Sequence, residues 1–429
     1  MKKRVGPVGR LFLALFFLLS FSSCGMGGGG TGGSSAPPSS TFSAPPNISP
    51  TSFGTISVDH NNNVWVATTF NNSPSNGLMK IPAGATSCAI TSSCPLISLG
   101  FTPAGIAVDG SGNVWVTNDV TSGSVTKIPS SIASSSNSVT CSSSNCPTFS
   151  GFNSPTGIAV DGSGNVWVTN PSQGSVTKIP SGASSCPPCP TFTGSPYFSN
   201  PTGIAVDGSG NVWVTNPSQG SVTKILSSTA SSSTSVTCSS SNCPTFSGFN
   251  SPTGIVVDGS GNVWVTNDVT SGAVTEISSS TASSSTSVIC SSSSCPIFSG
   301  FSNPVAITTT NTTPWVANRG STGTYSPGIV EITGISPCVS GSSSGCPEIT
   351  HFTNPVGLAF DTSGNLWVID AGSSTTVEIT LSALANATCS NATPCYQYSL
   401  PAVPVGIATD SLGNIWISLI NAQVLEYKP

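Results

Sequence analysis

The chain has 429 residues, of which only 6% are charged, and it contains 45 Gly, 34 Pro, 15 Cys and 8 Trp. Four of its ten basic residues lie within the first ten positions, which leaves six basic residues against fifteen acidic ones in the rest of the chain. A surface that acidic argues against nucleic acid and anionic lipid as partners. The many Trp, Val and Ile residues argue against a disordered chain.

The first 23 residues are typical of a secretory signal peptide. Basic residues precede an apolar stretch from Leu11 to Phe21, which is too short to remain as a membrane span. The sequence Phe21-Ser22-Ser23-Cys24 resembles the lipobox of bacterial lipoproteins, although Phe21 replaces the usual Leu. That resemblance implies cleavage before Cys24 and lipidation of Cys24; an ordinary secretion cleavage site is the alternative. Gly25 then implies retention at the outer membrane of a Gram-negative bacterium.

Three segments follow from this interpretation. Residues 1–23 form the signal peptide, and residues 24–40 are a Gly-, Ser- and Pro-rich stretch without charge, which is typical of a flexible tether. Residues 41–429 form the folded domain. We expect a protein of the cell envelope that contacts the membrane only through its lipid anchor.

An internal repeat organises the folded part. Every Trp occupies the same motif, at intervals of 46 to 52 residues: Trp65, Trp115, Trp167, Trp213, Trp264, Trp315, Trp367 and Trp416. The clearest copy reads Pro-Thr-Gly-Ile-Ala-Val-Asp-Gly-Ser-Gly-Asn-Val-Trp-Val-Thr-Asn, from Pro155 to Asn170. Because a single copy cannot bury both of its apolar faces, the copies must pack against one another.

Each copy predicts four strands. In the third copy these are Ile158–Val160, Val166–Asn170 after an Asp-Gly-Ser-Gly-Asn turn, and Ser175–Ile179, and a fourth strand follows each pair of cysteines. Four antiparallel strands repeated eight times predict an all-β fold, an eight-bladed β-propeller. Seven blades are the alternative if the irregular sixth copy, with a shortened turn from Thr308 to Pro314, folds as an insertion.

The two ends of the chain complement each other. The last copy stops after its third strand, Val424–Tyr427, whereas Thr41–Ala44 matches the fourth strand of a normal copy. We therefore expect the N-terminal segment to supply the outer strand of the eighth blade and close the ring.

Fourteen cysteines besides Cys24 fall into seven local pairs. In an oxidising compartment we expect each pair to form a disulfide between the third and fourth strands, worth roughly 2 kcal/mol in the chain-entropy model. The pairs are Cys88-Cys94, Cys141-Cys146, Cys186-Cys189, Cys238-Cys243, Cys290-Cys295, Cys338-Cys346 and Cys389-Cys395. Zinc binding and, for Cys186-Pro-Pro-Cys189, redox chemistry are the alternatives.

The repeat Pro-x-Gly-Ile-Ala-Val-Asp-x-x-Gly-Asn-Val-Trp-Val resembles that of NHL-repeat and streptogramin (virginiamycin B) lyase-like β-propellers. That resemblance covers nearly the whole folded part and implies architecture more than function, because such propellers include scaffolds, binders and a few enzymes. The lyases imply a histidine and a metal at the central channel. Here the two histidines, His60 and His351, fall in a turn and in an outer strand, so the sequence argues against catalysis.

One face of the ring carries the candidate binding residues. The second strands end there in Asn118, Asn170, Asn216, Asn267, Asn318 and Asp370, with Arg319 in the irregular sixth blade. A ring of amides suits neutral hydrogen bonding to a sugar or a peptide; local capping of the loops is the alternative. The Asp-Gly-Ser-Gly-Asn turns have oxygen side chains at alternate positions but lack the downstream carboxylate of a calcium loop.

The same third-strand position carries Lys in blades 1 to 4 and Glu in blades 5 to 8. The residues are Lys80, Lys127, Lys178, Lys224, Glu276, Glu331, Glu378 and Glu426. This division either orients a partner or reflects duplication at solvated sites.

The sequence thus favours a non-catalytic binding or scaffold propeller of the cell envelope, with a protein or a carbohydrate as ligand and no cofactor. A streptogramin lyase-like or lactonase-like enzyme is the alternative, and a divalent metal in the central channel would support it.

Overall fold

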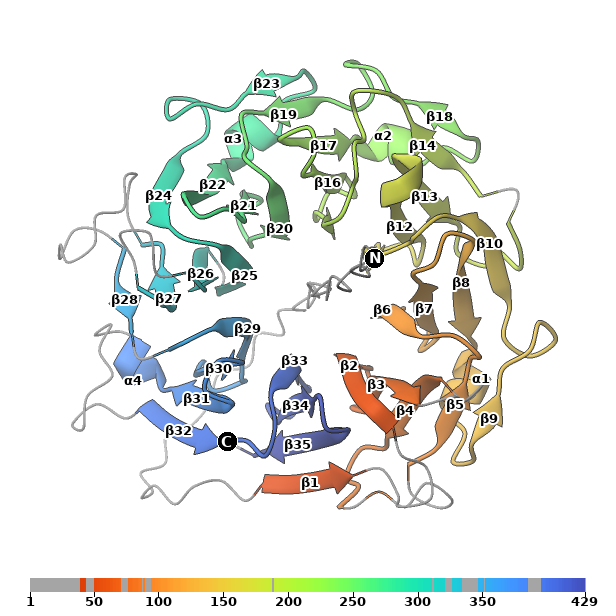
Figure 1. Cartoon of the computed structure of the whole chain (residues 1–429). Coiled ribbons are helices and arrows are strands. Elements are labelled where there is room, and N and C mark those ends of the chain that lie inside the picture. Colours follow the sequence, from red (N-terminus) through yellow and green to blue (C-terminus); the bar gives the residue numbers. More distant parts are fainter. Residues whose placement is uncertain are drawn as a thin grey trace, which may run out of the picture.

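The computed structural model describes residues 39–43, 50–70, 76–86, 88, 94–186, 189–310, 312–320, 326–333, 346–350, 352–384 and 395–428. The predicted signal peptide, Cys24 and the tether up to residue 38 lie outside these residues. Eight small sheets form a closed ring (Figure 1). The eight-bladed prediction is therefore confirmed, and the seven-bladed alternative is wrong.

Each blade has four strands of its own, from an innermost first strand to an outer fourth strand. Blades 1 to 4 consist of β2 (Pro50–Val58), β3 (Val64–Phe70), β4 (Gly77–Ile81) and β5 (Leu96–Ser98); β6 (Pro103–Val108), β7 (Val114–Asn118), β8 (Gly123–Ile128) and β10 (Thr148–Phe152); β11 (Ile158–Val160), β12 (Val166–Asn170), β13 (Ser175–Ile179) and β14 (Thr191–Thr193); β15 (Ile204–Val206), β16 (Val212–Asn216), β17 (Ser221–Ile225) and β19 (Thr245–Ser247). Blades 5 to 8 consist of β20 (Pro252–Val257), β21 (Val263–Asn267), β22 (Gly272–Ile277) and β24 (Ile297–Phe301); β25 (Pro304–Thr310), β26 (Thr313–Asn318), β27 (Gly328–Glu331) and β28 (Glu348–Ile349); β29 (Pro355–Phe360), β30 (Leu366–Asp370), β31 (Thr375–Ile379) and β32 (Cys395–Ser399); β33 (Pro404–Thr409), β34 (Ile415–Leu419), β35 (Gln423–Tyr427) and β1 (Ser39–Ser43). The three predicted strands of the third repeat match β11, β12 and β13 residue for residue.

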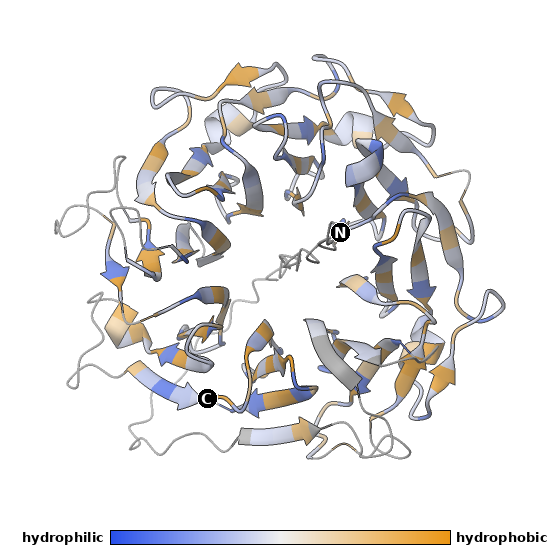
Figure 2. Ribbon diagram, in the orientation of Figure 1, coloured by the Kyte–Doolittle hydropathy of each residue, from blue (hydrophilic) through white to orange (hydrophobic). Residues whose placement is uncertain are grey.

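The apolar core is divided among the interfaces between neighbouring blades. In one cluster Trp167, Val176 and Phe192 of blade 3 pack against Val212 and Val214 of blade 4, and similar clusters recur around the ring. Figure 2 shows the apolar residues spread over the strands of all blades. Both faces of a blade are thus covered by its neighbours, as the repeat requires.

The N-terminal strand closes the ring. β1 pairs antiparallel with β35, with Thr41 opposite Leu425 and Phe42 opposite Val424. Phe42 is fully buried, and its ring centroid lies 5.5 Å from that of Trp416. The predicted closure is confirmed.

Close contacts near the ring centre join consecutive first strands. The Thr215 hydroxyl accepts a hydrogen bond from the Gly203 N–H at 2.8 Å and donates to the Thr253 carbonyl of the next blade at 3.1 Å. A Cβ atom on Gly203 would lie 2.3 Å from that carbonyl oxygen. The repeat needs glycine here because the backbone of the neighbouring blade comes too close for any side chain.

Blade 6 keeps the four-stranded pattern despite its short turn. β25 and β26 extend until only residues 311 and 312 separate them, and Thr310 pairs with Thr313. The shortened turn becomes a tighter hairpin inside a regular blade.

The helices of the described residues are α1 (Ser130–Ala133), α2 (Ser227–Ala230), α3 (Ser279–Ala282) and α4 (Leu381–Leu384), with a 3-10 turn at Pro171–Gln173. Within these residues we find no helix with the length and hydropathy needed to cross a membrane.

Candidate functional site

The predicted amide ring lies at the ends of the second strands, but most of its side chains are buried. Asn170, Asn216 and Asn318 have no exposed surface, and Asn267 is only 3% exposed. The Asn216 amide donates to the Thr223 hydroxyl at 3.0 Å and its carbonyl oxygen accepts from the Ser199 N–H at 3.3 Å. The contacts support the local capping role that the sequence left open.

Asp370, which ends the second strand of blade 7, also bonds within the protein. Asp370 accepts hydrogen bonds from the N–H groups of Thr353 and Asn354 at 2.8 and 2.7 Å. Burial alone would raise the pKa of Asp370, but these two bonds, with others from Ser373 and Gly372, lower it. Asn118 differs from these residues: its side chain is only partly buried, and its enclosed Oδ1 atom has no hydrogen-bond partner among the described residues.

Arg319 lies at the boundary between blades 5 and 6. Its Nη2 atom is 3.8 Å from Asp268 Oδ1, and both side chains are partly exposed. The Asn303 amide donates to the same Asp268 oxygen at 3.2 Å. An exposed pair at this distance contributes little to stability, so its main effect is to place one cation and one anion on the loop face.

The loops that the asparagines cap carry the exposed polar groups of this face. We use the name loop face for the connections between second and third strands together with those between blades. In blades 2 to 5 the loops between second and third strands carry the exposed hydroxyl and amide residues Thr121, Ser122, Ser172, Gln173, Ser218, Gln219, Thr270 and Ser271. Sequence reasoning missed them because it stopped at the strand ends, although the recurring Pro-Ser-Gln-Gly and Asp-Val-Thr-Ser-Gly loops follow directly.

The backbone of this face adopts a rare conformation at one repeated position. In four blades the residue directly before the first proline of the repeat has a positive φ angle, between 50 and 55°. These residues are Ser154, Asn200, Ser251 and Asn303. Side-chain-bearing residues seldom adopt the left-handed region, and such strain concentrates at functional sites.

The Asp-Gly-Ser-Gly-Asn turns on the opposite face use their oxygens internally. In blade 5 Asp258 Oδ1 accepts from the N–H groups of Ser260 and Asn262, both at 2.9 Å. Asp258 Oδ2 accepts from the Trp264 indole N–H at 2.9 Å. The Asp–Trp bond recurs in every blade except blade 6, where Thr310, the last residue of β25, replaces the Asp. The turn therefore anchors the buried Trp, and its oxygens are oriented toward N–H donors instead of a cation.

The Lys and Glu residues at this third-strand position are buried in five blades and partly buried in blades 2, 5 and 6, whereas solvated positions were expected. The register places each one directly opposite the Trp of its blade. Lys224 is 4% exposed, its Nζ lies 5.4 Å from the Trp213 ring centroid, and it donates to the Ala282 carbonyl of the next blade at 2.7 Å. Lys178 makes the equivalent bond to Ala230 at 2.8 Å. These lysines bond the last carbonyls of α2 and α3, which favours a cation there.

Burial shifts the pKa of several of these groups. It lowers the pKa of Lys80, Lys178 and Lys224, against the opposing effect of the turn aspartates. It raises the pKa of Glu331 to about 7. Because burial of a charge costs free energy, Lys178 and Lys224 depend on the carbonyl groups that they bond in the next blade.

The connection between third and fourth strands forms an arm in several blades. In blades 2, 4 and 5 twelve residues lie between the third strand and the first cysteine, and they form a short helix followed by β9 (Val139–Thr140), β18 (Val236–Thr237) or β23 (Val288–Ile289). Each of these strands adds in parallel to the outer strand of the preceding blade. Sequence reasoning missed this interblade pairing; the repeated Ser-Val before the cysteine was the available signal.

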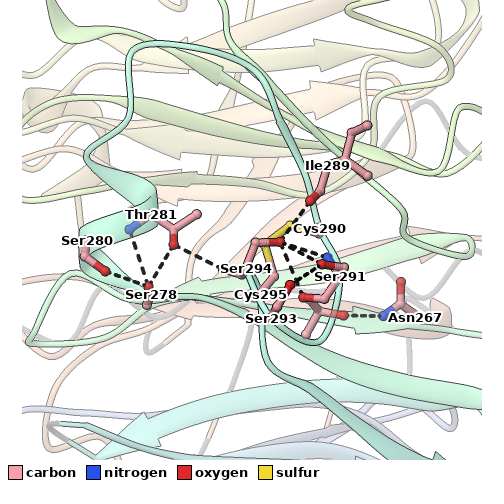
Figure 3. Close-up of a disulfide and its surroundings, with 11 residues drawn as sticks. Asn267, Ser278, Ser280, Thr281, Ile289, Cys290, Ser291, Ser293, Ser294 and Cys295 are labelled. Carbon is pink, nitrogen blue, oxygen red and sulfur yellow. Dashed lines mark hydrogen bonds between the residues drawn. A yellow bond between two sulfur atoms is a disulfide. The ribbon is translucent and has the colours of Figure 1, made fainter.

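The arm ends in the predicted disulfide. Figure 3 shows the Cys290–Cys295 bond beside α3, where the Thr281 hydroxyl donates to the Ser294 carbonyl at 3.1 Å. Five of the seven predicted disulfides are confirmed: Cys88-Cys94, Cys141-Cys146, Cys186-Cys189, Cys238-Cys243 and Cys290-Cys295. Cys346 and Cys395 are also disulfide-bonded, whereas their predicted partners Cys338 and Cys389 lie outside the described residues.

The described residues contain no group of three or more His, Cys, Asp or Glu side chains arranged to hold a metal ion. His60 is exposed in the first turn of blade 1, and His351 lies outside the described residues.

Comparisons with known proteins agree with this architecture. A catalytically inactive virginiamycin B lyase from Staphylococcus aureus with quinupristin is 12% identical, and the match covers 91% of this chain and 99% of that chain with a TM-score of 0.51. This chain has a β-propeller fold. Hydrazine synthase of Kuenenia stuttgartiensis is similar too, at 12% identity, with 76% and 95% of the two chains covered and a TM-score of 0.53. At such identities the likeness shows the fold alone. No protein-family model and no curated protein sequence matches the chain.

Proposed function

We propose that this protein is a non-catalytic binding or scaffold propeller of the cell envelope that recognises a carbohydrate or a protein on its loop face. The observation that carries the proposal is the run of exposed hydroxyl and amide side chains over blades 2 to 5. Its repeat sequence supports a relationship to NHL-repeat and streptogramin lyase-like propellers.

The buried asparagines give this face its rigidity. Asn170 and Asn216 fix the ends of the second strands in two neighbouring blades, so that the following Pro-Ser-Gln-Gly loops present the same groups in register. Prearranged donors and acceptors lose less entropy when they bind a ligand. Neutral polar groups suit a ligand that offers several hydroxyl or peptide groups and no dominant charge.

A triple alanine variant of Ser172, Ser218 and Gln219 tests this proposal. We expect it to weaken binding of the best ligand from a panel of neutral oligosaccharides and envelope proteins at least tenfold, because the loops lose their exposed polar groups while the supporting asparagines remain. The matched control replaces Ser111, Ser163 and Ser209, which are exposed in turns on the opposite face. Equal binding by both variants, measured by calorimetry, would rule out the loop face.

The export and anchoring of the chain are part of the proposal. The basic N-terminus, the apolar stretch from Leu11 to Phe21 and Cys24 support a lipoprotein of the outer membrane. Palmitate labelling in a Gram-negative host should mark the wild-type chain and spare the Cys24→Ser variant, and membrane fractionation should move that variant to the soluble fraction. Equal labelling of both chains would exclude Cys24 as the lipidated residue.

A further inference from the structure

The outer edges of blades 1, 3 and 4 are covered by an arm of the following blade, and the contacts are the same each time. The first residue of the outer strand donates its N–H to a serine hydroxyl of the arm, at 3.0, 3.1 and 3.0 Å. The third residue of that strand accepts from the N–H of the first arm cysteine, at 2.8, 2.6 and 2.8 Å. Between these bonds a valine of the arm pairs with the central apolar residue: Ile97 with Val139, Phe192 with Val236 and Phe246 with Val288.

Blade 2 has the same outer strand without the cover. The arm of blade 3 has only six residues before Cys186, half the length of the arms that reach their neighbour. β10 is therefore the last strand of its sheet, and no described residue pairs with its outer edge. Thr148 and Ser150 are exposed on this edge, whereas Leu96, which corresponds to Thr148 in blade 1, is buried.

The surroundings of one repeated glycine differ between covered and uncovered edges. A Cβ atom on Gly248 of blade 4 would lie 2.5 Å from the Cys290 carbonyl of the arm, and one on Gly194 of blade 3 would lie 3.1 Å from the Cys238 carbonyl. Gly151 holds the same place in blade 2, with φ of 94°, and nothing lies within 4 Å of its Cβ position. The space that an arm fills elsewhere is open here.

We propose that the outer edge of β10 binds an extended segment of a partner protein as a fifth, parallel strand. The segment has the pattern Ser-Val-Thr or Ser-Val-Ile, as in the arms. Its serine hydroxyl accepts from the Thr148 N–H, its valine lies beside Phe149, and a following N–H donates to the Ser150 carbonyl. This is recognition by strand addition, in which the main chain gives affinity and alternate side chains give specificity.

Apolar side chains that the valine of the partner segment would contact already lie beside β10. Phe149 is fully buried, and Cys186, Cys189 and Ala183 are partly buried against the same cluster. A β-branched residue beside Phe149 would cover these partly exposed groups, as Val288 covers the equivalent cluster in blade 4. The three described segments of this chain that carry the pattern are engaged in their own ring, so a second copy would have to open an arm to donate one. The occupant is therefore a different protein.

Fluorescence anisotropy with the full chain tests the site. The probe is a labelled Ser-Ser-Ser-Thr-Ser-Val-Thr peptide, the sequence of residues 231–237, and its control carries Pro in place of Val. We expect saturable binding of the probe and at least tenfold weaker binding by Thr148→Pro, which removes the outward N–H. Thr148→Val keeps that N–H and should bind as the wild type does. No saturable binding at millimolar protein, or equal binding by Thr148→Pro, would overturn the proposal.

A second variant tests the site without changing β10. Replacing residues 180–185 with the sequence of residues 226–237 gives blade 3 a long arm, which should cover β10 and abolish peptide binding with no fall in melting temperature. Undiminished peptide binding by this variant would contradict the proposal. Self-association of the wild-type chain that the long-arm variant loses would show a second copy as the occupant and overturn the assignment to a different protein.

Discussion

An alanine at position 203 is expected to lower the free energy of unfolding by about 3 kcal/mol, the upper part of the range for an overpacked site. The new Cβ atom would lie 2.3 Å from the Thr253 carbonyl oxygen and 2.8 Å from the Thr215 hydroxyl oxygen. Neither group can rotate away, because one is backbone and the other bonds both blades. The blades must separate, and separation in a closed ring strains every other interface.

Gly208→Ala is the matched control for this substitution. Gly208 lies in the first turn of the same blade, its φ is not positive, and no atom lies within 4 Å of its Cβ position. We expect a change within about 0.5 kcal/mol, because a surface substitution without new contacts has little effect. Urea unfolding followed by Trp fluorescence reports all eight blades. Equal midpoints for the two variants would show that the inner contacts between blades do not limit stability.

Replacement of Asp258 by alanine should cost about 3 to 4 kcal/mol. It removes the acceptor of the buried Trp264 indole N–H and of the Asn262 amide, and an unsatisfied buried donor costs about 1 to 3 kcal/mol. Asn262 also caps α3 by accepting from the Ser279 N–H at 2.7 Å. The variant should therefore loosen the arm. Relative to the wild-type chain, we expect hydrogen exchange to accelerate more in β23 than in β21.

Ser260→Ala controls for the turn, because the exposed Ser260 contributes its backbone N–H to Asp258 and keeps it in the variant. We expect wild-type unfolding midpoints and exchange rates for this control. If hydrogen exchange in β23 were unchanged in the Asp258→Ala variant, the Asp258 turn would not stabilise the arm, and this prediction would be wrong.

Local patterns predicted most of this fold. Alternation of β-branched runs with Asp-Gly-Ser-Gly-Asn turns located β11 to β13, the truncated last repeat predicted the pairing of β1 with β35, and cysteine spacing predicted the confirmed disulfides. These features depend on residues close in sequence or on counting strands per repeat.

The sequence-based predictions that failed concern residues whose surroundings depend on contacts between repeats. Lys224 is polar and falls on a strand, so sequence alone placed it in solvent; α3 of the next blade covers it. Asn216 occupies a strand end, where an amide serves a ligand or a loop equally well, and only the position of Ser199 decides between them. The exposed hydroxyl and amide groups of the loop face lie two to four residues farther along the chain, in the loops that follow the second strands.

We propose that the ligand of this propeller binds on the loop face and not at the ring centre. A crystal structure of the full chain grown with calcium, magnesium and the best-binding oligosaccharide tests it most directly. We predict ligand density against Ser172, Ser218 and Gln219, with no metal held among the first strands. A metal ion held by side chains at the ring centre, with the ligand bound beside it, would contradict the account and support an enzyme.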